Sequence, residues 1–433
     1  MSLKQKILGD VQVLVDSDPA YGIVSPGSVA VTGKMIGSDE ACAMVEAVLD
    51  GFLTAGRFND AFESELKSFI GAKHVLTVNS GSSANLVAFS ALTSPKLGES
   101  RIMRGDEVIT PAAGFPTTVN PIIQNGAIPV FVDIDLNTLN MNLDAMERAV
   151  SERTRAVMFA HTLGNPAQMD RVKRFTEKHN LWLVEDCCDS LGSRFNDQHV
   201  GTFGDVGTLS FYPAHHITTG EGGAVFTNSG KLKPILESFR DWGRDCFCPP
   251  GKDNTCGKRF CWKLGSLPPG YDHKYIYSNI GYNLKMTDVQ AACGLAQIKK
   301  LKNFCESRRE NFAILLGRLR KYSEHLLFVS EEAGARASWF GFPIMVKPES
   351  KISREMLQKH FEEEGVGYRY LFAGNLIRQP AYASVDHRVH GTLTNSDYVL
   401  ENLIWVGVHP LITSDCINRI VDCVDRTVNL TTE

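Results

Sequence analysis

The sequence predicts an α/β protein with a largely parallel sheet, and two observations lead to this class. Short segments rich in Val, Ile and Phe alternate with segments of helical length, which is the pattern of a parallel sheet covered by helices. The chain of 433 residues is 43% hydrophobic and 22% charged, so it has enough apolar surface for a large folded core. This length allows two or three domains.

The first predicted elements follow from the start of the chain. Residues 1–34 carry Gly, Pro and Ser without periodicity, so we expect an N-terminal arm. A helix is predicted from residue 38 onward, where apolar residues recur at spacings of three and four. Seven strand candidates then alternate with helical segments: residues 74–78, 107–111, 128–135, 156–162, 181–186, 207–212 and 223–228. Residues 35–295 are therefore predicted to form a large domain.

The alternation stops at a segment that we expect to be an insertion. Residues 244–275 are rich in Cys, Pro and Gly and are too many for an ordinary connection, so this segment needs an ordering device of its own. A strongly helical stretch follows, and residues 338–346 are a further strand candidate. Residues 296–433 are predicted to form a smaller α+β domain.

The charge and the chain start exclude several classes of protein. The net charge is −4, from 45 basic and 49 acidic residues, which argues against a nucleic-acid partner. The sequence has no run of about 18 apolar residues, so no membrane span is expected. The N-terminus lacks the apolar run and cleavage site of a signal peptide, and we expect a cytoplasmic protein. Its eleven cysteines are then expected to be free thiols or metal ligands.

Two short motifs suggest a bound phosphate group and a bound ring. Residues 79–85, Asn-Ser-Gly-Ser-Ser-Ala-Asn, join a predicted strand to a predicted helix. Free N–H groups at a helix start suit a phosphate, although an ordinary serine-capped helix explains the motif equally well. Asp186 ends a predicted parallel strand, where open α/β sheets bind ligands. It could hold a protonated pyridine nitrogen or merely cap a helix.

A third motif carries a family resemblance. Residues 210–215 read Ser-Phe-Tyr-Pro-Ala-His, and Gly-Glu-Gly-Gly follows at 220–223. This segment resembles the nucleotide-sugar aminotransferases of the DegT/StrS family, and the resemblance runs from about residue 35 to the C-terminus. Further matches occur in the same order at residues 56–63, 79–85, 114–118, 130–135 and 281–292. The resemblance implies the fold-type I pyridoxal-phosphate aminotransferase architecture, with the large domain binding the cofactor.

His215 departs from the family pattern, which has a lysine at this position. An imidazole cannot form the covalent link that a lysine amine makes to pyridoxal phosphate. We therefore expect non-covalent pyridoxamine 5′-phosphate (PMP), with His215 as the general base. The adjacent His216 could take this role instead, but the motif alignment favours His215.

The resemblance implies roles for the other site residues. Phe115 is expected to stack on the pyridine ring and Asp186 to pair with its nitrogen, while Tyr212 and Asp189 are expected to assist proton transfer. The phosphate contacts are expected from Gly81, Ser82, Ser83 and Ser210, and from Asn283 of a second subunit. The last contact implies a homodimer with shared active sites. Taken singly, these residues also have ordinary packing, sheet or turn roles.

Four cysteines form a separate pattern. Cys188, Cys246, Cys248 and Cys256 are separated by 57, 1 and 7 residues, and four thiolates can hold a zinc ion or an iron–sulfur cluster. The one-residue gap is unlike the paired spacing of structural zinc sites. With His215, the spacing resembles the branch of the family that holds a [2Fe-2S] cluster. Cys187 could replace Cys188, Cys261 could replace Cys256, and all of them could be free buried thiols; the family spacing favours the first set.

This branch implies a reaction and its partners. The expected reaction is C-3 deoxygenation of a nucleotide-linked 4-keto-6-deoxyhexose, with CDP as the expected nucleotide, in the formation of 3,6-dideoxysugars of lipopolysaccharide O-antigen. Dehydration would be followed by two one-electron reductions. The chain has no GxGxxG element that opens a Rossmann unit, so the electrons are expected from a separate NADH-dependent flavin and iron–sulfur reductase. Alternatives are a 3-dehydratase without a cluster, a zinc-stabilised aminotransferase relative and an inactive scaffold dimer.

Overall fold

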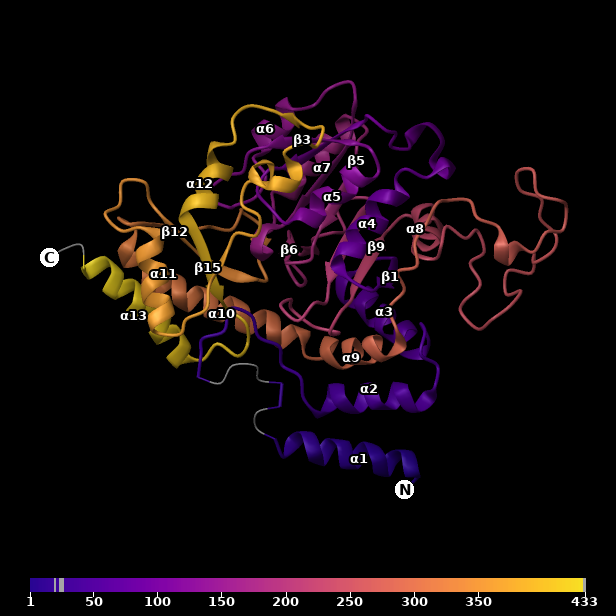
Figure 1. Ribbon diagram of the computed structural model, residues 1–433, viewed down its shortest axis with the longest axis horizontal. Helices are drawn as coiled ribbons and strands as arrows, with labels where there is room; N and C mark the ends of the chain where they lie inside the picture. Colours follow the sequence, from indigo (N-terminus) through magenta and orange to yellow (C-terminus); the bar gives the residue numbers. More distant parts are fainter. Residues whose placement is uncertain (19–20, 23–26, 431–433) are drawn as a thin grey trace.

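The computed structural model describes residues 1–18, 21–22 and 27–430 and confirms the predicted fold class. An eight-stranded sheet with the order β1-β9-β8-β5-β4-β2-β3-β14 forms the large domain (Figure 1). Neighbours from β8 through β5, β4, β2 and β3 to β14 are parallel, whereas β9 is antiparallel to both β8 and β1. The strands are β1 (His74–Val78), β2 (Glu107–Pro111), β3 (Ile128–Val132), β4 (Thr154–Ala160), β5 (Trp182–Asp186), β8 (Val206–Ser210), β9 (Gly223–Thr227) and β14 (Arg388–Val389).

Helices cover both faces of this sheet. Met158 packs in a cluster with α4 and α8, while its neighbours Val157 and Phe159 pack in another with α6 and α7. Successive side chains point to opposite faces, so burial of both faces explains the nearly continuous apolar strands. The helices of this domain are α2 (Ser38–Asp50), α3 (Arg57–Ile70), α4 (Gly81–Ala91), α5 (Pro116–Gln124), α6 (Leu143–Arg148), α7 (Met169–Lys178), α8 (Leu232–Arg240) and α9 (Asp288–Ile298), with 3₁₀ turns at Pro95–Ser100 and Thr162–Gly164.

The C-terminal part forms the expected smaller α+β unit. Its antiparallel sheet has the order β10-β12-β15-β13, and its helices pack on that sheet in one apolar cluster, which also includes Ile134 and Leu163 of the large domain. The elements are β10 (Leu326–Leu327), β12 (Gly341–Val346), β13 (Arg369–Tyr370), β15 (Leu403–Gly407), α11 (Arg354–Glu363), α12 (Thr394–Asn402) and α13 (Ser414–Asn429), with 3₁₀ turns at Arg320–Tyr322, Leu376–Arg378 and Pro380–Tyr382. The last residues of the predicted domain, 431–433, lie outside the described residues.

The two domains are less separate than a boundary at residue 295 suggests. That position falls inside α9, and α10 (Leu301–Leu319) contributes to both cores. Phe304 at its start packs with the large domain, while Leu315 near its end packs with the small one. The C-terminal part also returns β14 to the edge of the large sheet, where Arg388 pairs with the buried Glu107 at 2.6 Å. A small third sheet consists of β11 (Ala335–Arg336), β6 (Arg194–Phe195) and β7 (Gln198–His199).

The N-terminal arm begins with a helix that the sequence analysis did not predict. Helix α1 (Leu3–Asp16) starts with a capping box at Ser2 and lies beside α2. Lys4 joins the two helices through ion pairs to Glu46 and Asp50. Residues 19–20 and 23–26 of the predicted arm lie outside the described residues, and Val29 and Val31 beyond them pack in the core of the small domain.

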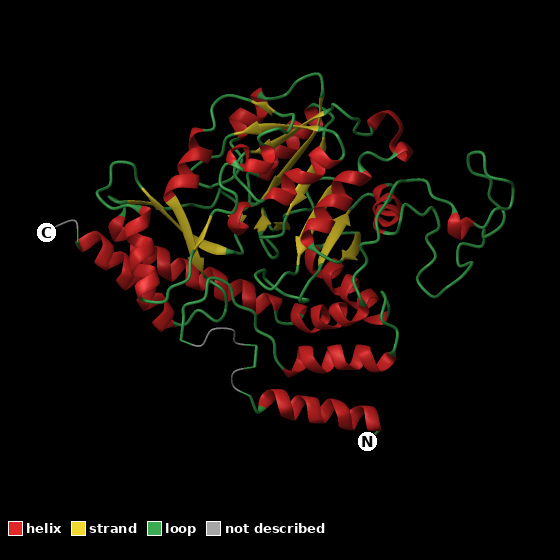
Figure 2. Cartoon of the chain, viewed as in Figure 1, coloured by secondary structure: helices red, strands yellow, loops and turns green. Residues whose placement is uncertain are grey.

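The cysteine-rich insertion is almost wholly loop, as Figure 2 shows. It contains one 3₁₀ turn, His273–Tyr275, and extends beyond α8 on the side of the large domain opposite the small domain (Figure 1). Among the described residues, the buried apolar clusters include none from 244–275. Within the same described ranges, no helix is long and apolar enough to cross a membrane.

Candidate active site

A cavity of about 760 Å³ opens at the carboxyl ends of β5 and β8, where the small domain faces the large sheet. This volume is within the range of small-molecule and cofactor sites. Nine of the predicted site residues line it: Gly81, Ser82, Phe115, Asp186, Cys188, Asp189, Ser210, Tyr212 and His215. The predicted motifs, far apart in the sequence, therefore meet at one end of the sheet, where open α/β sheets bind ligands.

One end of the cavity is the N-terminus of α4. Ser80 caps this helix, with its Oγ accepting a hydrogen bond from the Ser83 N–H at 3.0 Å. A Cβ added to Gly81 would lie 2.4 Å from the Ser210 Cβ, so only glycine allows the helix to approach β8 this closely. Both sequence interpretations are thus present, a serine cap and an open helix start that suits an anion. The Ser83 hydroxyl lies 2.9 Å from Ser80 Oγ and belongs to the cap.

Asp186 lies on the floor of the cavity and is held by several donors. Asn85 Nδ2 and Thr118 Oγ1 each donate to its Oδ2 at 2.7 Å, and the Cys188 N–H donates to its Oδ1 at 3.1 Å. The side chain is buried. These hydrogen bonds fix the direction of the carboxylate, because each donor comes from a different part of the large domain.

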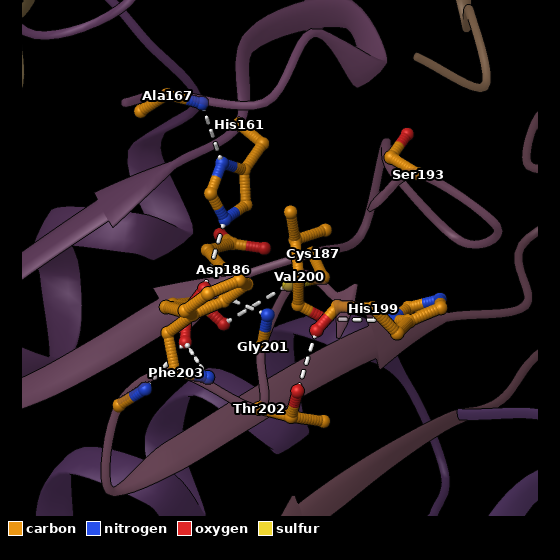
Figure 3. Close-up of polar contacts among 12 residues, drawn as sticks. His161, Ala167, Asp186, Cys187, Ser193, His199, Val200, Gly201, Thr202 and Phe203 are labelled. Carbon is orange, nitrogen blue, oxygen red and sulfur yellow. Dashed lines mark hydrogen bonds and ion pairs between the residues drawn. The ribbon is translucent and has the colours of Figure 1, made fainter. Parts of the chain in front are cut away.

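The residue before Asp186 has a structural role on the other face of the strand. Glu185 accepts hydrogen bonds from the N–H groups of Gly201, Phe203 and Gly204 at 2.7–2.9 Å. His161 Nε2 lies 3.1 Å from Glu185, while its Nδ1 accepts from the Ala167 N–H. Figure 3 shows this network around β5. It anchors the loop that follows β7 and so supports the strand that presents Asp186.

His215 lies beside two acidic side chains. Its Nδ1 is 3.5 Å from Asp189 Oδ1, and among the described residues this nitrogen has no hydrogen-bond partner. Burial lowers the pKa of His215 to about 4, against the opposing charge of Asp186. Burial and the Asp186 charge raise the pKa of Asp189 well above its usual range. At neutral pH the imidazole is therefore unprotonated and able to accept a proton.

Two aromatic residues of the predicted site are available to a bound molecule. Phe115 precedes α5 and Tyr212 follows β8, and both line the cavity while remaining half-exposed. The ring of Phe115 contacts Phe372 of the small domain edge-on, with 5.8 Å between centroids. That contact joins the two walls of the cavity at this point.

Several lining residues were not predicted from the sequence. The small domain contributes Phe340, Arg369, Tyr370, Phe372 and Trp405. No motif distinguishes these residues, and tertiary packing alone brings them to the cavity. Glu221 also lines it, and its place within the Gly-Glu-Gly-Gly segment was a signal that could have identified it.

The predicted cysteine set is only partly assembled. The Sγ atoms of Cys246, Cys248 and Cys256 lie within 4.8 Å of one another on the insertion, whereas Cys188 lines the cavity. Burial opposes ionisation of Cys248, but hydrogen bonds from Thr255 and the Cys256 N–H outweigh it and lower its pKa. Three thiols therefore form a group suited to a metal, and the fourth predicted ligand of the same chain lies elsewhere.

The remaining predicted residues lie outside these groups. Cys187 is fully buried in the core, and Cys261 is exposed on the insertion. Asn283 forms a backbone bridge with Asp241, and its Oδ1 accepts from Lys285 Nζ at 3.3 Å. Asn283 does not line the cavity of its own chain within the described residues.

The sheet order and the cavity at its carboxyl edge define a fold-type I pyridoxal-phosphate aminotransferase-like protein. The chain belongs to the DegT/DnrJ/EryC1/StrS aminotransferase family, whose model matches residues 35–425. The family resemblance found in the sequence is thus confirmed.

Individual relatives match nearly the whole chain. It is 59% identical over 403 residues to the lipopolysaccharide biosynthesis protein RfbH of Salmonella typhimurium, covering 93% of this chain and 92% of that protein. It is 51% identical over 393 residues to dTDP-4-dehydro-2,6-dideoxy-D-glucose 3-dehydratase of Saccharopolyspora spinosa, covering 91% and 85%. Among solved structures, E. coli GDP-4-keto-6-deoxy-D-mannose-3-dehydratase with bound hydrated PLP superimposes with a TM-score of 0.81 at 28% identity, covering 91% of this chain and 98% of that chain.

Proposed function

We propose that this protein removes the C3 hydroxyl of a nucleotide-linked 4-keto-6-deoxyhexose, using PMP bound without a covalent link. The specific activity that we infer is that of a CDP-6-deoxy-L-threo-D-glycero-4-hexulose-3-dehydrase. The observation that carries the proposal is His215, which lies in the cavity where the family has its lysine. The 3-dehydratase names of two of the relatives described above support the same reaction.

The cavity fits the cofactor. Gly81, Ser82 and Ser210 would hold the phosphate at the start of α4, Asp186 would pair with the ring nitrogen, and Phe115 would cover the ring. When bound, PMP would supply the amine that condenses with the C4 carbonyl and a ring that receives the electrons left by the C4′ proton and delivers them to expel the C3 hydroxyl.

His215 is assigned as the general base. Its Nδ1 is buried beside Asp189, so Nε2 is the nitrogen left to accept a proton. The imidazolium formed in this way lies near Asp186, whose negative charge favours it. Tyr212, which lines the cavity and is half-exposed, would assist proton transfer.

An iron–sulfur centre is part of the proposal. We infer that Cys188, Cys246, Cys248 and Cys256 hold a [2Fe-2S] cluster and that a separate NADH-dependent flavin and iron–sulfur reductase supplies its electrons. The three neighbouring thiols support this assignment. Within one chain, however, the position of Cys188 does not fit a four-thiolate site.

That misfit favours a second candidate function, a PMP-dependent 3-dehydratase that needs no electron transfer. The experiment that separates the two is an absorption spectrum with iron and sulfide analysis on anaerobically purified protein. About two iron and two sulfide per chain, with a visible band beyond that of the cofactor, supports the reductive enzyme. Absence of metal leaves the simple dehydratase, and zinc alone leaves a zinc-stabilised relative.

The chemistry itself is tested by adding PMP and 4-keto-6-deoxyhexoses carrying CDP, dTDP or GDP. Mass spectrometry should show loss of the C3 oxygen from one of them. Failure to bind PMP would instead indicate an inactive scaffold dimer.

A further inference from the structure

The four cysteines assigned to the cluster lie in two places. Cys246, Cys248 and Cys256 gather on the insertion, which extends from the large domain on the side away from the small domain (Figure 1). Cys188 lines the cavity that faces the small domain. In the described part of the chain, no residue of 244–275 lines that cavity.

The insertion has a nitrogen near its thiols, but this nitrogen does not complete the group. His273 Nδ1 lies 3.8 Å from Cys256 Sγ, while its Nε2 is 3.1 Å from Asp245 Oδ2. The ring stacks on Trp262, with 4.1 Å between centroids. Among the described residues, the group that closes within 4.8 Å contains the three thiols without His273. A four-ligand site therefore still needs one more donor.

The insertion also presents an uncovered apolar surface. Phe247, Phe260 and Tyr275 are 51–59% exposed, and just after the insertion Tyr277 is 53% and Ile280 93% exposed. Apolar side chains gathered on a projecting segment mark a surface that another molecule covers. Cys188, the fourth predicted ligand, lines an open cavity. A second copy of this chain with its insertion seated there would both cover these apolar side chains and complete the ligand set.

We propose that the cluster is assembled between two copies of the chain, with the three thiols of one insertion and Cys188 of the partner subunit as its ligands. A two-fold axis makes the exchange reciprocal, so a dimer closes with two equivalent clusters. Each cluster would then lie at the wall of the partner's cavity, beside Asp186 of the partner subunit. The inference rests on the proposed function, because it needs a cluster to be present.

Mixed dimers test this arrangement. Two differently tagged copies are co-expressed, one carrying Cys188→Ser and the other carrying Cys246→Ser with Cys248→Ser, and the mixed dimer is isolated anaerobically by both tags. If each cluster is shared between two subunits, one site of the mixed dimer keeps all four thiols and the other site loses three. If each cluster forms within a single chain, both sites lack at least one thiol. Iron, sulfide and visible absorption should therefore reach about half of the wild-type value, while each variant alone should hold none.

Four outcomes overturn the inference. A folded mixed dimer without iron would show that each cluster forms within one chain. Iron at the wild-type level in the Cys188→Ser homodimer would show that Cys188 is not a ligand and that the insertion, with His273, is sufficient. Wild-type protein that holds iron as a monomer would also exclude the arrangement. Wild-type protein without iron would overturn both this inference and the electron-transfer part of the proposed function. The other three outcomes overturn the shared cluster alone, so the two failures can be told apart.

Two controls keep the test interpretable. Cys261→Ser changes an exposed thiol of the same insertion outside the three-thiol group, and it should leave the iron content unchanged. Cys188→Ala replaces Cys188→Ser if the serine variant folds poorly, with far-UV circular dichroism and PMP binding as measures of folding.

Discussion

The cavity and the insertion differ in how their residues are held. Several cavity residues stand at the ends of β5 and β8, strands that are buried almost throughout, and Asp186 is fixed by donors from three directions. The insertion, by contrast, contributes nothing to the described apolar clusters, and some of its ion pairs, such as Lys274 with Asp253, lie at the surface. Surface ion pairs stabilise weakly. The scaffold of the large domain therefore holds the cofactor site in place, while the insertion depends on a metal or a partner for its order.

Removal of the insertion is the strongest test of this difference. Replacing residues 246–274 with a short Gly-Ser linker should abolish iron binding completely, because all three grouped thiols are lost. The melting temperature should change by only a few degrees, since almost no buried apolar area goes with the segment. Calorimetry and PMP titration measure the two effects. Loss of folding would show that the insertion supports the large domain.

Within the cavity, the largest expected effect comes from His215. His215→Asn removes the base and should lower the rate of C3 oxygen loss by about 10²–10⁴-fold, with PMP binding retained. The matched comparison is His216→Asn, whose imidazole Nε2 contacts the Ser338 carbonyl at 2.8 Å and should affect stability rather than rate. A rate loss in the His216 variant alone would reverse the assignment.

Gly81→Ala should have a smaller effect. The added methyl meets the Ser210 side chain, so α4 and β8 must separate, at a cost of about 1–3 kcal/mol. PMP should bind more weakly for the same reason, as a fluorescence titration would show. Gly230→Ala, where a methyl has open space, is the control, and equal losses in both variants would contradict the close-approach argument.

The smallest expected effect is the contribution of His199 to the pH dependence of stability. Burial lowers the pKa of His199 from 6.5 to about 4, and its Nε2 accepts from the Gly192 N–H at 2.9 Å. The folded state therefore resists protonation that the unfolded chain accepts, and the free energy of unfolding should fall as pH drops from 6.5 to 4. The share of His199 is about 3 kcal/mol at most.

His199→Asn should flatten this pH dependence in urea unfolding series at several pH values. His390→Asn, which changes a partly exposed histidine elsewhere in the chain, is the control for the slope rather than for the absolute stability. A slope identical to that of the wild type would contradict the assignment to His199.

The sequence predicted those elements of the fold whose residues show a clear hydrophobic pattern. Strands such as β4 and β5 are buried on both faces, so their apolar runs are unbroken and visible. Helix α1 lacked such a signal because most of its residues are exposed, and Val15 alone is buried among the described ones. A boundary at residue 295 was predicted from the change of pattern, yet α10 belongs to both cores.

Some residues of the site could be predicted from the sequence and others could not, for a similar reason. Motifs at 79–85 and 210–223 identified residues that the backbone itself brings to the cavity. Arg369 and Trp405 reach it only through packing of the small domain, which leaves no local pattern. The spacing of the four cysteines along the chain suggested a single ligand group. Spacing alone, however, does not show whether all four ligands of one cluster come from the same subunit.

The return of β14 to the large sheet has a consequence for synthesis of the chain. Glu107 is fully buried, and its carboxylate is paired with Arg153 and with Arg388, both at 2.6 Å. Until residue 388 leaves the ribosome, β3 is an open edge of the sheet and the Glu107 carboxylate lacks its partner Arg388. The nascent large domain therefore cannot complete its sheet until residues 388 and 389 of the 433 have emerged, and it remains open to pairing with other chains until then.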